Sequence, residues 1–261
     1  MYQSKESCFI SKELSLGLYF LRQLLEKPSK YKWECPIAHL VPRSPDYTST
    51  GDTSLFAGGG YSLDLKFWWY IHWPEEIQSK TLKFFTINKK DFSTRELISI
   101  NLLEFVVVII NYTAASHVLS LRPLSVKNHY PLLLNWTDNT TANKWAIKSA
   151  TTNIAGRGLS HLFCALRLNN PLGLNTDFIP GHLNTIADRI SRVHTPSGFP
   201  PDFTFLSQEF PELNSCLRFH PSQELLSCLL RALLSTLEPG VQMPKTLGHI
   251  SPDNNFTSTS L

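Results

Sequence analysis

The sequence predicts a mixed α/β fold, in which a five-stranded mixed sheet is flanked by helices. Three observations support this fold class. Short aromatic-rich runs bounded by turn residues lie between positions 47 and 87 and are typical of β-strands. The segment 97–119 is apolar on most faces, as expected of a helix buried against a sheet. The short continuous apolar run at 131–136 suits a central strand that is buried on both faces.

The first part of the predicted sheet consists of antiparallel hairpins. A strand that carries Asp52 runs into a glycine turn at 58–60, and two more strands are predicted at 66–73 and 81–87. The buried helix at 97–119 follows them.

Helices and strands alternate in the second part. After the central strand a helix begins near Thr141, and another is predicted over 159–168, where Asn169-Asn170-Pro171 ends it. The last strand is predicted at 174–179 and a short final helix at 185–192. The order β-β-β-α-β-α-α-β-α implies a mixed sheet with helices on its faces.

Changes in composition divide the chain into four parts. A helical pattern at 14–25 precedes a proline-rich stretch, which indicates an N-terminal arm or connection. A Pro/Gly linker and an apparent helix at 222–237 follow the domain, and the last residues are rich in Ser, Thr and Asn. The predicted parts are an arm at 1–46, the α/β domain at 47–192, a linker with a helical spacer at 193–238, and a disordered tail at 239–261.

The composition also bears on compartment and partners. The net charge of +3 is compatible with a polyanionic partner without requiring one. Five cysteines without a CxxC pair disfavour a zinc site or a disulfide framework and favour a reducing compartment. The longest apolar run, 98–115, contains Asn101, Glu104 and Asn111, so a buried helix is favoured over a membrane span. We therefore expect an intracellular protein, in the cytoplasm or the nucleus, that does not bind a membrane.

Four acidic residues stand out by their positions. Asp52 lies in a strand, Glu104 lies inside the most apolar helix, Asp138 ends the most apolar strand, and Asp188 follows the last strand. An ionised carboxylate in such surroundings is unfavourable unless it is paired or binds a cation. Because no basic residue lies three or four positions from Glu104, a divalent metal is an attractive partner, and oxygen ligands favour Mg²⁺ or Mn²⁺. Any single acid could instead be a solvated or capping residue, so the hypothesis depends on all four.

Four segments resemble the ribonuclease H domain of retrotransposon reverse transcriptases, most closely that of DIRS-type and gypsy-type elements. They occur in the order of the family and cover about residues 47–192, and the last of them is the most specific. The segments are GDTS at 51–54 with the glycines at 58–60, NLLE at 101–104, TDNTTA at 137–142, and IPGHLNTIADRISR at 179–192. One departure is Thr53, where the family usually has alanine.

The resemblance implies a ribonuclease H-like fold and hydrolysis of the RNA strand of RNA–DNA hybrids during reverse transcription. It implies that Asp52, Glu104, Asp138 and Asp188 bind two Mg²⁺ ions, for which Mn²⁺ can substitute. Cellular ribonucleases H have a histidine after a glycine before the last carboxylate, where it assists product release. His182 is therefore a candidate catalytic residue, with a polar loop residue as the alternative. In a full element the partner would be a covalently linked polymerase domain.

Binding of a hybrid requires contacts to the phosphates of both strands and to 2′-hydroxyls. The candidates beside Asp138 are Asn139 and Thr140, with Lys144 and Arg157 nearby. The backbone at Gly59 could approach the nucleic acid closely, although the glycines could equally form only a turn.

The sequence leaves three alternative functions. An aspartic protease, suggested by Asp52-Thr53-Ser54, is disfavoured because Thr50-Gly51 replaces the apolar residues that should precede the aspartate. A strand-transfer domain of the same superfamily commonly uses three acids, whereas four acids favour the hydrolase. A catalytically inactive fragment of the same fold, a relic or a tethering module, would not require the acids to converge or to bind metal.

Overall fold

We describe the protein from a computed structural model. The structure describes residues 12–26, 42–86, 97–122, 130–148, 154–193, 203–234 and 243–251. Most of the proline-rich stretch, the Pro/Gly linker at 194–201 and the end of the predicted tail lie outside these residues.

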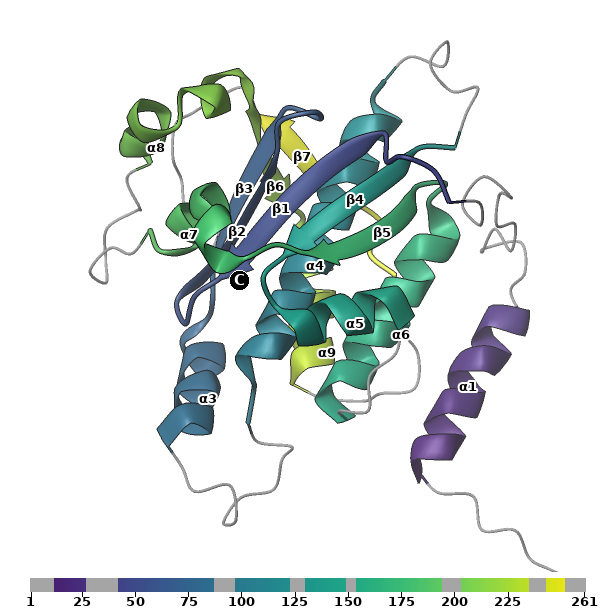
Figure 1. Cartoon of the computed structure of the whole chain (residues 1–261). Coiled ribbons are helices and arrows are strands. Elements are labelled where there is room, and N and C mark those ends of the chain that lie inside the picture. The colour runs from purple at the N-terminus through teal and green to yellow at the C-terminus, as the bar shows by residue number, and fades with distance from the viewer. Residues whose placement is uncertain are drawn as a thin grey trace, which may run out of the picture.

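A seven-stranded mixed sheet forms the centre of the molecule (Figure 1). Its strand order is β5-β4-β1-β2-β3-β6-β7. Strands β1, β2 and β3 are antiparallel, β4 and β5 run parallel to β1, β6 is parallel to β3, and β7 is antiparallel to β6. The strands are β1 (Tyr47–Thr53), β2 (Ala57–Ser62), β3 (Phe67–His72), β4 (Leu132–Thr137), β5 (Gly173–Phe178), β6 (Leu217–Pro221) and β7 (Gly248–Ser251).

Helices cover both faces of this sheet (Figure 1). The larger hydrophobic core lies between the sheet and α4, α5, α6 and α9, and a smaller one lies under α7, α8 and η4. The helices are α1 (Lys12–Glu26), α3 (Glu75–Thr86), α4 (Ile100–Ser120), α5 (Thr140–Lys148), α6 (Ile154–Asn169), α7 (Thr185–Ser191), α8 (Thr204–Glu209) and α9 (Gln223–Leu233). The described residues also include the short 3₁₀ helices η3 (Gly181–Leu183) and η4 (Pro211–Ser215).

Helix α4 is the centre of the larger core, and all its residues from Leu102 to Ser116 are buried. By length and composition alone it could cross a membrane, but 89% of its most apolar 18-residue stretch is buried inside the protein. The prediction of a long buried helix that contains Glu104 is therefore confirmed.

The glycine segment 58–60 forms strand β2, so the prediction of a turn there is wrong. A side chain on Gly58 or Gly60 would meet Val107 or Asn111 of α4, whereas one on Gly59 would lie 2.3 Å from Ile190 of α7. Successive residues of a strand face opposite sides of a sheet, and here helices pack closely on both sides. Glycine is required because of this close packing and not because of a turn.

Residues 81–86 belong to helix α3, so the strand predicted at 81–87 is also wrong. Pro74 directly precedes the helix, and Glu75 and Glu76 occupy its first turn, where a carboxylate is favourable. Ile77 and Thr81 lie one turn apart and are both buried. The remaining predicted strands, at 66–73, 131–136 and 174–179, are confirmed as β3, β4 and β5.

The folded unit does not end at residue 192. Strand β6 pairs with β3, β7 pairs with β6, and α9 packs into the larger core. The expected count of five strands and the separate helical spacer are therefore wrong, and residues 243–251 are not part of a disordered tail. The physical reason is the apolar stripe of α9, which must be buried against another element (Leu225, Leu226, Leu229, Leu233).

Candidate metal centre

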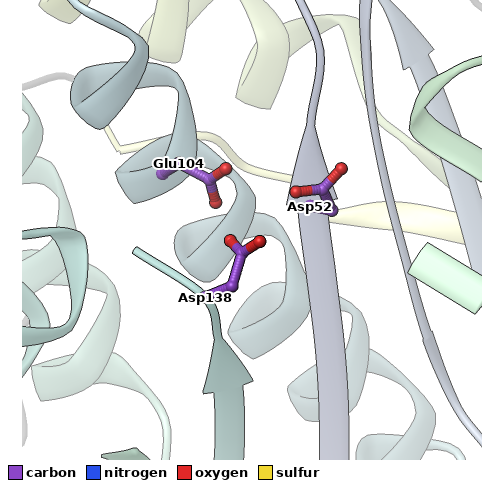
Figure 2. A group of neighbouring side chains, drawn as sticks. All are labelled: Asp52, Glu104 and Asp138. Atoms are coloured by element: carbon purple, nitrogen blue, oxygen red, sulfur yellow. The ribbon is translucent and has the colours of Figure 1, made fainter. Parts of the chain in front are cut away.

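Three of the four predicted acids meet at one edge of the sheet. Asp52 lies near the end of β1, Asp138 directly follows β4, and Glu104 lies in the second turn of α4. Because β1 and β4 are parallel, their carboxyl ends meet at the same edge. Figure 2 shows the three side chains pointing toward one another, and they offer oxygen atoms that all lie within 4.8 Å of one another. The three acids are close enough to bind a metal ion.

Glu104 is the most buried of these acids, with 4% of its surface exposed. Burial raises the pKa of Glu104 well above its ordinary value, and the charges of Asp52 and Asp138 raise it further. Hydrogen bonds from the Thr53 backbone and from the Thr137 hydroxyl, the latter at 3.5 Å, favour the ionised form. A divalent cation would provide the positive charge that these bonds do not, which fits the all-oxygen donor set.

Asp52 is also buried, and burial raises its pKa to about 6, with further contributions from Asp138 and Asp188. The Ser191 hydroxyl opposes this rise by donating a 2.6 Å hydrogen bond to Asp52 Oδ2. Ser191 was not singled out in the sequence, although it lies three residues after Asp188 in the most specific motif.

A buried polar network lies behind the acids and fixes α4 against the sheet. Asn111 lies two turns after Glu104 on α4 and accepts a 2.7 Å hydrogen bond from Trp69 Nε1 of β3. Asn111 Nδ2 donates to Asn135 Oδ1 of β4 at 2.8 Å, and Ser49 of β1 donates to the same oxygen at 3.1 Å. Because these groups are buried and paired, the network fixes the register of α4 and thereby the position of Glu104.

Asp188 lies beside the cluster but does not belong to the group of three. Its Oδ1 accepts a 2.6 Å hydrogen bond from Arg192 Nε, and both side chains are partly exposed. The charge of Asp188 nevertheless raises the pKa of Asp52 and of Asp138, so it acts on the site electrostatically. The structure thus brings three predicted ligands together and leaves the fourth, next to them, paired with arginine.

Helix η3, which contains the predicted catalytic histidine, passes close to one of the acids. A side chain on Gly181 would lie 3.1 Å from Asp138 Oδ2, so the backbone there passes close to that carboxylate. His182 follows directly and is exposed to solvent.

The residues predicted to contact nucleic acid differ in how accessible they are to solvent. Gly59 is buried under α7, so the prediction that its backbone reaches a ligand is wrong. Asn139 Oδ1 accepts from the backbone of Thr141 and Ala142 at 3.0 and 2.9 Å, which caps α5, and its Nδ2 donates to Asn101 at 2.8 Å. Its side chain therefore holds α5 against α4.

The other predicted contacts are more accessible. Thr140 and Lys144 are exposed on α5, and Arg157 is half-buried on α6.

No family model, curated protein or solved structure matches the chain.

Proposed function

We propose that the chain is the ribonuclease H domain of a retroelement reverse transcriptase and hydrolyses the RNA strand of RNA–DNA hybrids. The observation that carries the proposal is the convergence of Asp52, Glu104 and Asp138 from a strand, a helix and a strand end onto one point. Burial and the charges of neighbouring carboxylates raise the pKa of Glu104 and of Asp52, so their ionised forms are unfavourable without a cation. Perturbed acids of this kind are typical of functional sites.

The arrangement of elements supports a ribonuclease H-like fold. Three antiparallel strands, β1, β2 and β3, are followed by the parallel strands β4 and β5, which alternate with helices. Strands β6 and β7 extend this arrangement at the β3 side, away from the acids on β1 and β4.

In the proposed site Asp52, Glu104 and Asp138, with Asp188 beside them, would hold two Mg²⁺ ions. The ions would supply activation of a water molecule and stabilisation of the leaving oxygen of the phosphodiester. Thr137 and Ser191 orient the carboxylates, and His182 assists the release of product.

The substrate is bound beside this edge of the sheet. Lys144, Thr140 and Arg157 are proposed to contact phosphates of the hybrid, since they extend from the two helices that follow Asp138. In a full element the domain works next to a covalently linked polymerase, inside the cell.

A catalytically inactive fragment is the second candidate. The pairing of Asp188 with Arg192 favours it, because that ion pair leaves the fourth carboxylate outside the group of three. In this alternative the domain serves only as a relic or a tether.

A cleavage assay tests both candidates. The purified chain is incubated with an RNA–DNA hybrid labelled on either strand, in Mg²⁺ or Mn²⁺, beside EDTA and an Asp138→Asn variant. Asp177→Asn is the matched control, because Asp177 is an exposed acid on β5 outside the cluster. We expect cleavage of the RNA strand alone, retained by Asp177→Asn and lost in EDTA and in Asp138→Asn. A folded chain that neither cleaves the hybrid nor binds metal by calorimetry would favour the inactive fragment.

A further inference from the structure

Arg218 is buried on the face of the sheet that carries α7 and α8, away from the acids. It lies on β6 opposite Trp68 of β3, and only 1% of its surface is exposed. The guanidinium carbon lies 5.1 Å from the centroid of the Trp68 ring and 5.1 Å from that of Phe203. The two rings hold the guanidinium in one place within the smaller core.

Among the described residues the Arg218 guanidinium has no hydrogen-bond partner. Its Nε, Nη1 and Nη2 atoms are all buried, and none is hydrogen-bonded in the described part of the chain. Burial lowers the pKa of Arg218 to about 10, so the group is still charged at neutral pH. Burial raises the pKa of the neighbouring Tyr70 to about 12, so Tyr70 is neutral and does not balance the charge. An unpaired buried charge is costly, and cation–π contacts offset only part of this cost.

We propose that Arg218 is the anchor of a phosphate-binding site beneath α8. A guanidinium presents five N–H donors in a planar fork, and here none of its nitrogens is paired. One carboxylate engages two donors side by side, whereas a phosphate offers more oxygens and can engage donors on both edges of the fork. The aromatic surroundings exclude water and so strengthen such a pair. This site is independent of the carboxylate cluster and of the proposed nuclease activity.

Helix α8 is the element that must move to admit the phosphate. It has six residues, of which Leu206 is buried. Phe203, directly before the helix, is buried in the same core. The polar ties of α8 to α7 are an exposed ion pair between Glu209 and Arg189 at 2.9 Å and the Arg189 guanidinium, which lies 4.5 Å from the centroid of the Phe205 ring. Exposed pairs contribute little to stability, and short segments with few buried contacts open at low cost.

Thermal unfolding of the full chain in EDTA, titrated with inorganic phosphate at constant ionic strength, tests the proposal. EDTA removes any contribution of metal at the carboxylates. We expect the Tm to rise with the logarithm of phosphate concentration, by roughly 5 °C or more at a hundredfold excess over Kd. Arg218→Met should lose this rise without a lower Tm in phosphate-free buffer, because an unpaired buried charge has been removed. Arg218→Lys, which keeps the charge but not the fork, should show a reduced rise, and Arg231→Met, at an exposed arginine on α9, should respond as the wild type does.

A Tm that does not respond to phosphate, or that responds equally in Arg218→Met, would overturn the proposal. Asp202 precedes Phe203 in the sequence, outside the described residues, and its own carboxylate is the rival anion. We expect Asp202→Asn to keep the phosphate response. If Asp202→Asn and Arg218→Met each lowered the stability by the same amount and the double variant lowered it no further, Asp202 would be the partner of Arg218 and the proposal would be overturned. A single-stranded oligonucleotide, added in place of phosphate, distinguishes the phosphates of a nucleic-acid backbone from a small free phosphate.

Discussion

The Ser191 hydroxyl donates a 2.6 Å hydrogen bond to Asp52 Oδ2 and thereby joins α7 to β1 inside the carboxylate cluster. The backbone carbonyl of Ser191 accepts a 2.7 Å hydrogen bond from Ser54, just after β1. Asn184, at the start of α7, donates to the Gly51 carbonyl at 3.2 Å. Both ends of α7 are therefore tied to β1, which fixes Asp188 beside the three converging acids.

Ser191→Ala should raise the pKa of Asp52 above its value of about 6, because the ionised carboxylate loses a hydrogen bond that stabilises it. For a rise of about one unit, Mg²⁺ affinity should fall roughly fivefold at pH 6 and much less at pH 8, where Asp52 is ionised in both proteins. Calorimetric titration with Mg²⁺ at the two pH values measures this difference. Ser207→Ala, at an exposed serine of α8, is the control, and an equal loss at both pH values would contradict the prediction.

Glu104→Gln should change how stability depends on pH when metal is absent. The folded-state pKa of Glu104 lies above the ordinary value of 4.5. As the pH rises above 4.5, Glu104 of the unfolded chain loses its carboxyl proton while Glu104 of the folded chain keeps it. The free energy of unfolding of the wild type therefore falls. The glutamine variant lacks this loss, and we expect it to become the more stable protein as pH rises toward 8.

Urea unfolding in EDTA between pH 4 and pH 8 measures the effect as a difference between wild type and Glu104→Gln, in which other titrating groups cancel. Mg²⁺ should reverse the order at pH 8, because it stabilises the ionised wild-type cluster. A difference that does not vary with pH would show that Glu104 titrates normally in the folded chain.

Arg192→Gln and Asp188→Asn should change metal affinity in opposite directions. Loss of Arg192 removes a positive charge near the cluster and frees Asp188, so Mg²⁺ should bind several-fold more tightly. Loss of the Asp188 charge should weaken binding. Because the ion pair is partly exposed, both variants should unfold within about 1 kcal/mol of the wild type. Weaker Mg²⁺ binding by Arg192→Gln would mean that Arg192 supports the site and does not compete for Asp188.

Gly59→Ala should destabilise the fold because its new methyl group would lie 2.3 Å from Ile190 Cγ2. Overpacking of a core costs about 1–3 kcal/mol, so we expect a loss in this range. Ile190→Ala in the same chain should restore part of it by making room, and a double-mutant cycle measures this coupling. Gly17→Ala on α1, where a methyl group would meet nothing within 4 Å, is the matched control. Additive effects of Gly59→Ala and Ile190→Ala would contradict the close packing of α7 on β2.

Features with a local cause could be predicted from the sequence. The apolar segment 97–119 and the run 131–136 contain enough hydrophobic residues in a short stretch to specify α4 and β4. Glu104 lies inside the first of these segments and Asp138 just after the second, and the same apolar surroundings indicate both as candidate site residues. Helix α3 could also have been predicted, because Pro74 and the glutamates after it indicate a helix start.

The remaining features depend on partners that are distant in the sequence, and only the tertiary structure decided them. Gly58–60 form a strand because α4 and α7 pack against both of its sides, whereas glycine on its own equally suits a turn. Strand β6 joins the sheet by pairing with β3, where Leu217 lies opposite Phe67, 150 residues earlier in the chain. Likewise, the sequence placed four acids in order, but the fold determined that three converge while Asp188 pairs with Arg192. Local hydrophobic patterns determine which segments are helices or strands, and packing between distant segments determines which side chains meet.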